Sequence, residues 1–172
     1  MQVFPVDASG HPAFSDDFGA PRSGGRSHRG TDLFAPIGTP VLAVDAGSVT
    51  FGRGELPGVF AVLHAQDGAR YFYGHLLAVE GDPRPVKAGD VIGYVGDSGN
   101  AQGKPSHVHF EISPTGKDAD TVNPFPLLLA VPNSPAHLQT TPFSKAKRDS
   151  SGFFLLLCFA GMAFLEKSRG PW

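Results

Sequence analysis

The sequence predicts an all-β fold: a compact antiparallel β-sheet core, followed by a C-terminal linker and a short, apolar, helical tail. First, 22 glycines and 16 prolines among 172 residues disfavour a helix bundle, because both residue types are poor in helix interiors. Second, short segments rich in β-branched residues alternate with turn residues. No window before the C-terminal apolar run has the 3.6-residue period of an amphipathic helix.

Five segments carry the strand pattern, and all lie within residues 14–131, which we expect to form the folded domain. In chain order they are 41–52, 59–64, 69–76, 91–96 and 107–112. Ala46-Gly47 supplies a turn within the first segment. Gln66-Asp67-Gly68 separates the second from the third and is a strong hairpin signal.

The two ends of the chain differ from this core. Residues 1–13 are expected to be a loose lead-in, without the basic and apolar regions of a signal peptide. Residues 132–151 hold three prolines among polar residues and are expected to be a linker. Residues 152–172 form the tail, in which 152–165 is free of charges. As a helix this run reaches about 21 Å, so packing on an apolar patch or at a membrane interface is favoured over a short membrane anchor.

Charge and cysteine content narrow the function classes. The net charge of −2 gives no basic excess for a phosphate backbone, so we expect no nucleic-acid partner. The single cysteine, Cys158, excludes an intramolecular disulfide and any multi-cysteine zinc or iron–sulfur site. The seven histidines are therefore the main candidates for metal-binding or catalytic residues. The oligomeric state is not predicted by any of these features.

Two short motifs combine into a candidate metal site. His28 and Asp32 lie four residues apart in a segment that we expect to be extended, so both side chains can point to one face. His107 and His109 are two residues apart in a predicted strand and also share a face, while Val108 and Phe110 face the core. Three nitrogen and oxygen ligands that leave one position for water are typical of a catalytic zinc site.

His75 is a further candidate. Tyr71, Tyr73 and His75 share one strand face, opposite to Phe72 and Leu76, which predicts that His75 points away from the core. A solvent-exposed strand histidine without function is the alternative.

The order of these motifs resembles the lysostaphin/LytM-type zinc metallopeptidases, which cut peptides of bacterial peptidoglycan. The matching stretches are SHRGTDLFAPIGTPVLAVDAGSV (27–49), DGARYFYGHL (67–76), VKAGDVIGYVGDSGN (86–100) and SHVHFEI (106–112). The resemblance runs from about Phe18 to Pro126. One departure is Lys104-Pro105-Ser106, where many members have a shorter Gly-Pro approach to the last motif.

The resemblance implies a fold, a cofactor and a site. The fold would be the duplicated hybrid motif also found in the glucose-permease phosphocarrier domain, with the site in a groove between loops. One zinc ion per chain would be bound by His28, Asp32 and His109, with His75 and His107 as the catalytic histidines. The substrate would be a peptidoglycan peptide, and the location extracytoplasmic.

Two other function classes remain open. A biotinyl or lipoyl carrier domain would need a modified lysine at a hairpin tip, and the turns at 46–47 and 67–68 contain none. A phosphocarrier domain could use two facing histidines, but it would have no use for Asp32 at a fixed spacing from His28. A non-catalytic relative that regulates a partner enzyme would be marked by loss of a ligand, and all five positions are retained.

Arg22 is expected to form a surface salt bridge, with substrate or oxyanion binding as the alternative. Residues 96–104 are expected to be a turn that shapes one wall of the groove.

Overall fold

The computed structural model describes residues 1–132 of the chain. The linker and the apolar tail expected beyond Pro132 lie outside the described residues. Within the described part, no helix is long and apolar enough to cross a membrane.

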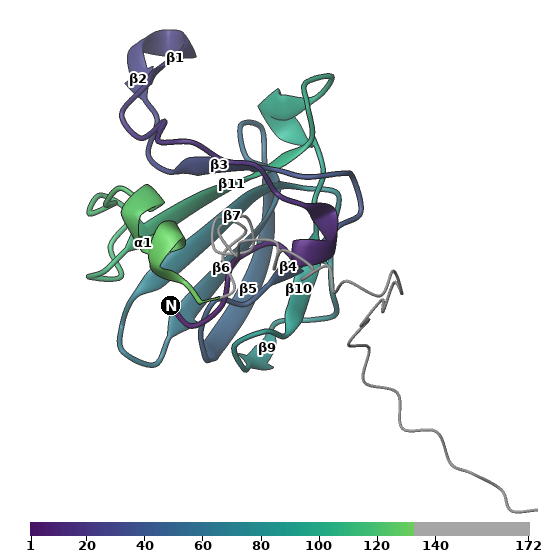
Figure 1. Ribbon diagram of the computed structural model, residues 1–172, viewed down its shortest axis with the longest axis vertical. Coiled ribbons are helices and arrows are strands. Elements are labelled where there is room, and N and C mark those ends of the chain that lie inside the picture. The colour runs from purple at the N-terminus through teal and green to yellow at the C-terminus, as the bar shows by residue number, and fades with distance from the viewer. Residues whose placement is uncertain (133–172) are drawn as a thin grey trace, which may run out of the picture. The chain divides into compact units, whose positions relative to one another are not determined.

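The architecture is built from antiparallel sheets, which confirms the predicted fold class (Figure 1). The main sheet has six strands in the order β3-β11-β7-β6-β5-β9. Their bounds are β3 Thr31–Phe34, β11 His107–Ser113, β7 Arg70–Leu76, β6 Gly58–Ala65, β5 Gly47–Gly54 and β9 Arg84–Val86. A second sheet has the order β4-β10-β8, with β4 Pro40–Leu42, β10 Val91–Tyr94 and β8 Ala78–Val79. A separate ribbon pairs β1 Pro21–Arg22 with β2 Arg26–Ser27.

Strand β11 shows how alternation separates the core from the site. Val108 and Phe110 are fully buried among the core side chains. His107 and His109 alternate with them and so point to the opposite face of the sheet. The predicted placement of this histidine pair on one strand face is confirmed.

The expectation of a loose lead-in over residues 1–13 is wrong. Phe4 and Val6 are almost completely buried in the core. The backbone of this segment also pairs with β4, because the N–H of Asp7 donates to the Pro40 carbonyl and the N–H of Leu42 donates to the Pro5 carbonyl. The segment lacks a longer run of β-branched residues, so the sequence pattern did not predict it. Two apolar side chains, separated by one residue, are nevertheless enough to hold it against the core.

The described residues also contain one α-helix that the sequence pattern missed, α1 at Phe125–Ala130. It is too short to display a helical period, and its residues are apolar on every side. Leu128 anchors it in the core. The side chain of Asn123 accepts the N–H of Phe125 and donates to Asp16, which ties the helix start to the segment before β1. Three single-turn 3₁₀ helices, η1 Ala8–Gly10, η2 Ser23–Gly25 and η3 Gly99–Ala101, complete the elements.

The strand faces predicted for β7 require a correction. Tyr71 and Tyr73 are buried in the core, whereas Phe72 lies on the site face beside His109. The pairing of β7 with β6 shifts register between Val59 and Ala61, which places an extra residue in β7 before Leu76. His75 lies at this bulge with φ of 64°, so it leaves the face of the tyrosines. The prediction that His75 points away from the core is correct, but the reason is the bulge and not simple alternation.

Candidate metal and catalytic site

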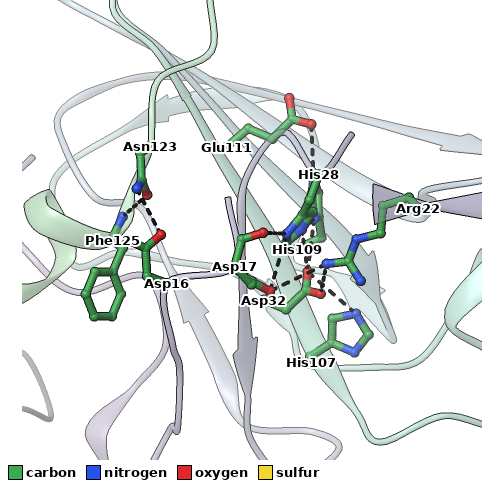
Figure 2. Close-up of polar contacts among 10 residues, drawn as sticks. All are labelled: Asp16, Asp17, Arg22, His28, Asp32, His107, His109, Glu111, Asn123 and Phe125. Carbon is green, nitrogen blue, oxygen red and sulfur yellow. Dashed lines mark hydrogen bonds and ion pairs between the residues drawn. The ribbon is translucent and has the colours of Figure 1, made fainter. Parts of the chain in front are cut away.

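His28, Asp32 and His109 converge on one point, as their sequence positions predicted (Figure 2). His28 Nε2 lies 3.0 Å from Asp32 Oδ1 and 2.9 Å from His109 Nδ1. The third side of the triangle, from His109 Nδ1 to Asp32 Oδ1, is 3.0 Å. Within residues 1–132 no other group of three such residues is arranged to hold a metal ion.

Neighbouring strands bring these groups together. Asp32 of β3 lies directly opposite His109 of β11 in the strand register. His28 precedes β3, and its N–H donates to the Ala20 carbonyl. Between them Gly30 passes close to β11: a Cβ at this position would lie 2.2 Å from the Phe110 carbonyl oxygen and 3.1 Å from His109 Cε1. Only a residue without a side chain lets the His28–Asp32 segment approach the strand that carries His109.

We expect the Gly30→Ala substitution to lower the thermal unfolding midpoint and weaken metal binding together. Relieving the clash with the Phe110 carbonyl requires a backbone shift, and overpacking of this kind costs about 1–3 kcal/mol. Ser27→Ala, at an exposed neighbouring position, is the matched control. Thermal unfolding and metal titration of both variants provide the test. An unchanged midpoint and affinity in Gly30→Ala would contradict the role given to this glycine.

Hydrogen bonds on the far side of each ring decide which nitrogen faces the cluster. His28 Nδ1 lies 2.9 Å from the Asp17 carbonyl oxygen, which can only accept, so Nδ1 carries the hydrogen. His109 Nε2 lies 3.0 Å from Glu111 Oε1 and donates to that carboxylate. In the neutral rings, His28 Nε2 and His109 Nδ1 therefore carry no hydrogen. Their lone pairs point toward each other and toward Asp32 Oδ1. Such outer contacts are typical of histidines that bind metals.

Three electron-pair donors about 3 Å apart require a positive charge between them. Burial lowers the pKa of His109, but hydrogen bonds to Asp32 and Glu111 outweigh it and raise the pKa to about 9. Burial raises the pKa of Asp32, but the hydrogen bonds with His109 and His28 hold that pKa well below its usual range. Two imidazole nitrogens and one carboxylate oxygen are ligands that zinc commonly takes, at about 2.0–2.2 Å. The donor set therefore fits a zinc ion.

His75 and His107 flank this cluster from two strands. Their ring centroids are 5.0 Å apart, and the His75 ring lies 6.1 Å from that of His109. His107 Nδ1 lies 2.8 Å from the Pro105 carbonyl and His75 Nδ1 lies 2.9 Å from the Ser98 carbonyl, so both rings present Nε2 as the free nitrogen. His107 Nε2 is 4.0 Å from Asp32 Oδ1, outside the 3 Å triangle. Burial, with the neighbouring His107, lowers the pKa of His75 to about 4.

The segment 96–104, which we expected to be a turn, holds the His75 side chain in place. Besides the carbonyl contact, Ser98 Oγ accepts the N–H of Val59 and donates to the Leu76 carbonyl. Ser98 thus bridges both strands beside the β7 bulge. The Lys104-Pro105-Ser106 departure has a similar effect on His107, because its Pro105 carbonyl fixes the orientation of that ring.

Arg22 does form an ion pair, but at the site. Its Nη2 lies 2.6 Å from Asp32 Oδ2, the oxygen that faces away from the histidines, and 3.5 Å from Asp17 Oδ2 (Figure 2). Sequence reasoning also missed Asp17 and Glu111. Glu111 was detectable, since it follows His109 by two residues on the same strand face. Asp17 gave no signal, because its main contact with His28 is made by the backbone carbonyl.

The antiparallel β fold and the His/Asp/His cluster flanked by two further histidines agree with the resemblance to the lysostaphin/LytM-type peptidases. The family model described as Peptidase family M23 matches residues 26–124. The chain belongs to peptidase family M23.

Individual relatives agree with this assignment. The DD-carboxypeptidase/endopeptidase Mpg of Neisseria meningitidis is 37% identical over 108 residues, covering 62% of this chain and 24% of that protein. A lipoprotein NlpD/LppB homolog of Pseudomonas aeruginosa is 32% identical over 120 residues, covering 67% of this chain and 39% of that protein. The chain thus spans about a quarter of the length of the first of these relatives.

Solved structures give the same picture. The catalytic domain of lysostaphin from Staphylococcus simulans has 28% identity and a TM-score of 0.61, covering 71% of this chain and 97% of that one. A zinc-containing peptidase from Vibrio cholerae has 27% identity and a TM-score of 0.58, covering 69% of this chain and 37% of that one.

Proposed function

We propose that the protein is a zinc-dependent metalloendopeptidase that hydrolyses peptide bonds of bacterial peptidoglycan. The observation that carries this proposal is the triangle formed by the lone pairs of His28, Asp32 and His109. Contacts with Asp17 and Glu111 fix the tautomers of the two histidine rings. We assign these three residues as the ligands of one zinc ion. The family membership supplies the peptidase class.

When bound, zinc would polarise the scissile carbonyl and acidify a water molecule. The protein contributes the proton transfers through His75 and His107. Each ring is held at Nδ1 by a backbone carbonyl and has Nε2 free to take a proton from the attacking water or to return it to the leaving amine. Burial and the neighbouring His107 lower the pKa of His75 to about 4, so that ring is neutral at neutral pH and its Nε2 is unprotonated. Neither step needs a serine or cysteine nucleophile.

A non-catalytic regulatory relative is the second candidate. Two relatives, the NlpD/LppB homolog and the cell division protein DipM of Caulobacter vibrioides, do not carry peptidase names. Against this reading, all five candidate residues of this chain are assembled around one point. A hybrid-motif carrier would have no use for the tautomer-fixing contacts of Asp17 and Glu111.

Two measurements separate these candidates. Elemental analysis of purified protein is expected to give about one zinc per chain. Digestion of purified peptidoglycan with glycine bridges and with directly cross-linked stems, followed by mass spectrometry, identifies the bond that is cut. Stoichiometric zinc without any new peptide fragment would favour the non-catalytic relative, and absence of zinc would favour the carrier.

The substrate also bears on where the protein acts. Peptidoglycan lies outside the cytoplasmic membrane, so we propose an extracytoplasmic location. Membrane contact through 152–165 remains a further proposal on a segment outside the described residues.

We propose that the functional domain needs nothing beyond Pro132. The described core already includes the buried side chains of Leu128 and Val131, and residues 1–132 hold all five site residues. A chain that ends at Pro132 is expected to fold cooperatively and to bind zinc with the same stoichiometry as the full chain. Thermal unfolding and zinc analysis of both chains test this. An unfolded or insoluble short chain would show that residues 133–172 complete the core.

A further inference from the structure

The ribbon β1–β2 beside the candidate metal site has an unusual charge arrangement. Arg22 and Arg26 lie directly opposite each other in its register. Residues directly opposite in an antiparallel pair share a face, with Cβ atoms about 4.5–5.5 Å apart, and like charges there are destabilising. The ribbon has only two residues in each strand and is exposed throughout, so little else stabilises it. Asp32 and Asp17 pair with Arg22, so Arg26 is the member of this arginine pair without a carboxylate partner among the described residues.

The charge is local and contrasts with the rest of the chain. The chain as a whole has a net charge of −2. The stretch 21–30, in contrast, holds three arginines and no acidic residue. Within residues 1–132, the side-chain polar contacts of Arg26 are to Ser23 alone, through Nε and Nη2, and include no carboxylate.

The position of the pair points to a substrate and not to bulk solvent. Arg22 Nη2 contacts Asp32 Oδ2 at 2.6 Å, which places this guanidinium at the edge of the proposed zinc site. The contacts of Arg22 within the described residues use Nη2 only, so Nε and Nη1 keep their N–H donors available. Arg26 likewise has Nη1 unused there. Guanidinium groups match carboxylates in geometry and charge.

We propose that Arg22 and Arg26 together bind a carboxylate of the peptide substrate next to the bond that is cut. This inference rests on the proposed peptidase function and specifies its substrate class: peptides whose carboxylates are free, over the same peptides with carboxamides. Figure 1 shows the ribbon projecting beyond β3, the strand that carries Asp32.

Arg26 is the residue to change, because it touches none of the proposed ligands. The test compares the zinc-loaded full chain with its Arg26→Gln variant on two synthetic stem peptides, one with free carboxylates and one fully amidated. Lys87→Gln is the control: it removes one positive charge from an exposed position directly after β9, at the opposite edge of the main sheet from β3.

We expect the wild type to favour the free-carboxylate peptide about tenfold in kcat/KM, as one charge-assisted hydrogen-bonded contact provides. Arg26→Gln should lose that preference through KM, with kcat and zinc content unchanged, and should leave the amidated peptide unaffected. Lys87→Gln should behave as wild type. An equal loss on both peptides, or an undiminished preference in Arg26→Gln, would overturn the proposal.

A binding measurement keeps this result separate from the proposed peptidase activity. The full chain carrying His107→Ala, with and without Arg26→Gln, is titrated calorimetrically with each peptide. Tighter binding of the free-carboxylate peptide that disappears with Arg26→Gln supports the arginine pair even if no peptide is cut. Equal binding of the two peptides to the His107→Ala chain refutes it, whatever the activity.

Discussion

Replacing His28, Asp32 or His109 by alanine is expected to remove both zinc and peptide hydrolysis. Each residue supplies one corner of the 3 Å triangle, so any substitution leaves two donors for the ion. Loss of an outer contact to a ligand typically costs 10–100-fold in metal affinity or activity, and loss of a ligand itself should cost more than ~100-fold. Zinc analysis and peptidoglycan digestion on the same preparations provide the measurement.

His64→Ala is the matched control for these ligand variants, because it removes an exposed histidine of β6 that lies outside the cluster. It should keep zinc and turnover at wild-type levels. If one of the three ligand variants retained full zinc and wild-type turnover, the ligand assignment of that residue would be wrong.

His75→Ala and His107→Ala are expected to separate metal binding from turnover. Both rings lie next to the triangle without belonging to it, as the 4.0 Å distance from His107 Nε2 to Asp32 Oδ1 indicates. Each variant should therefore keep about one zinc per chain. The loss of a proton-transfer group typically costs about 10²–10⁴-fold, so turnover should fall at least ~10²-fold.

Circular dichroism of each variant guards against a trivial loss of folding, since both histidines are buried. If His107→Ala lost zinc while His109→Ala kept it, His107 would be the zinc ligand of β11 and His109 the proton-transfer residue. Full turnover in His75→Ala would remove His75 from the mechanism while leaving the zinc site intact.

The sequence predicted the convergence of the candidate residues better than it predicted the edges of the fold. Alternation in β11 follows directly from strand geometry, so the shared face of His107 and His109 was readable from two residues. The same reasoning assigned Phe72 to the core, because no sequence signal marks the bulge that lies further along β7. Simple alternation holds only while the ladder is regular.

Other features could not be predicted from the sequence, because they depend on tertiary contacts that residue types do not reveal. The burial of Phe4 and Val6 depends on a partner strand more than thirty residues later in the chain, β4. The Asp17 carbonyl that orients His28 belongs to the backbone, and any residue type could supply it. Arg22 was readable as an ion-pair residue, but its partner Asp32 became visible only once the ribbon was placed beside β3.

The left-handed backbone of His75 has a consequence for the evolution of this domain. A residue other than glycine in that conformation costs about 1–3 kcal/mol, a sizeable share of a domain's net stability of about 5–15 kcal/mol. Glycine would adopt this conformation without that cost, and glycine is the residue at two nearby positions with positive φ, Gly58 and Gly99. A stabilisation programme that scores folding without assaying hydrolysis would therefore tend to discard His75 early. On the role proposed for His75, a glycine at that bulge would raise thermal stability and lower the rate of hydrolysis.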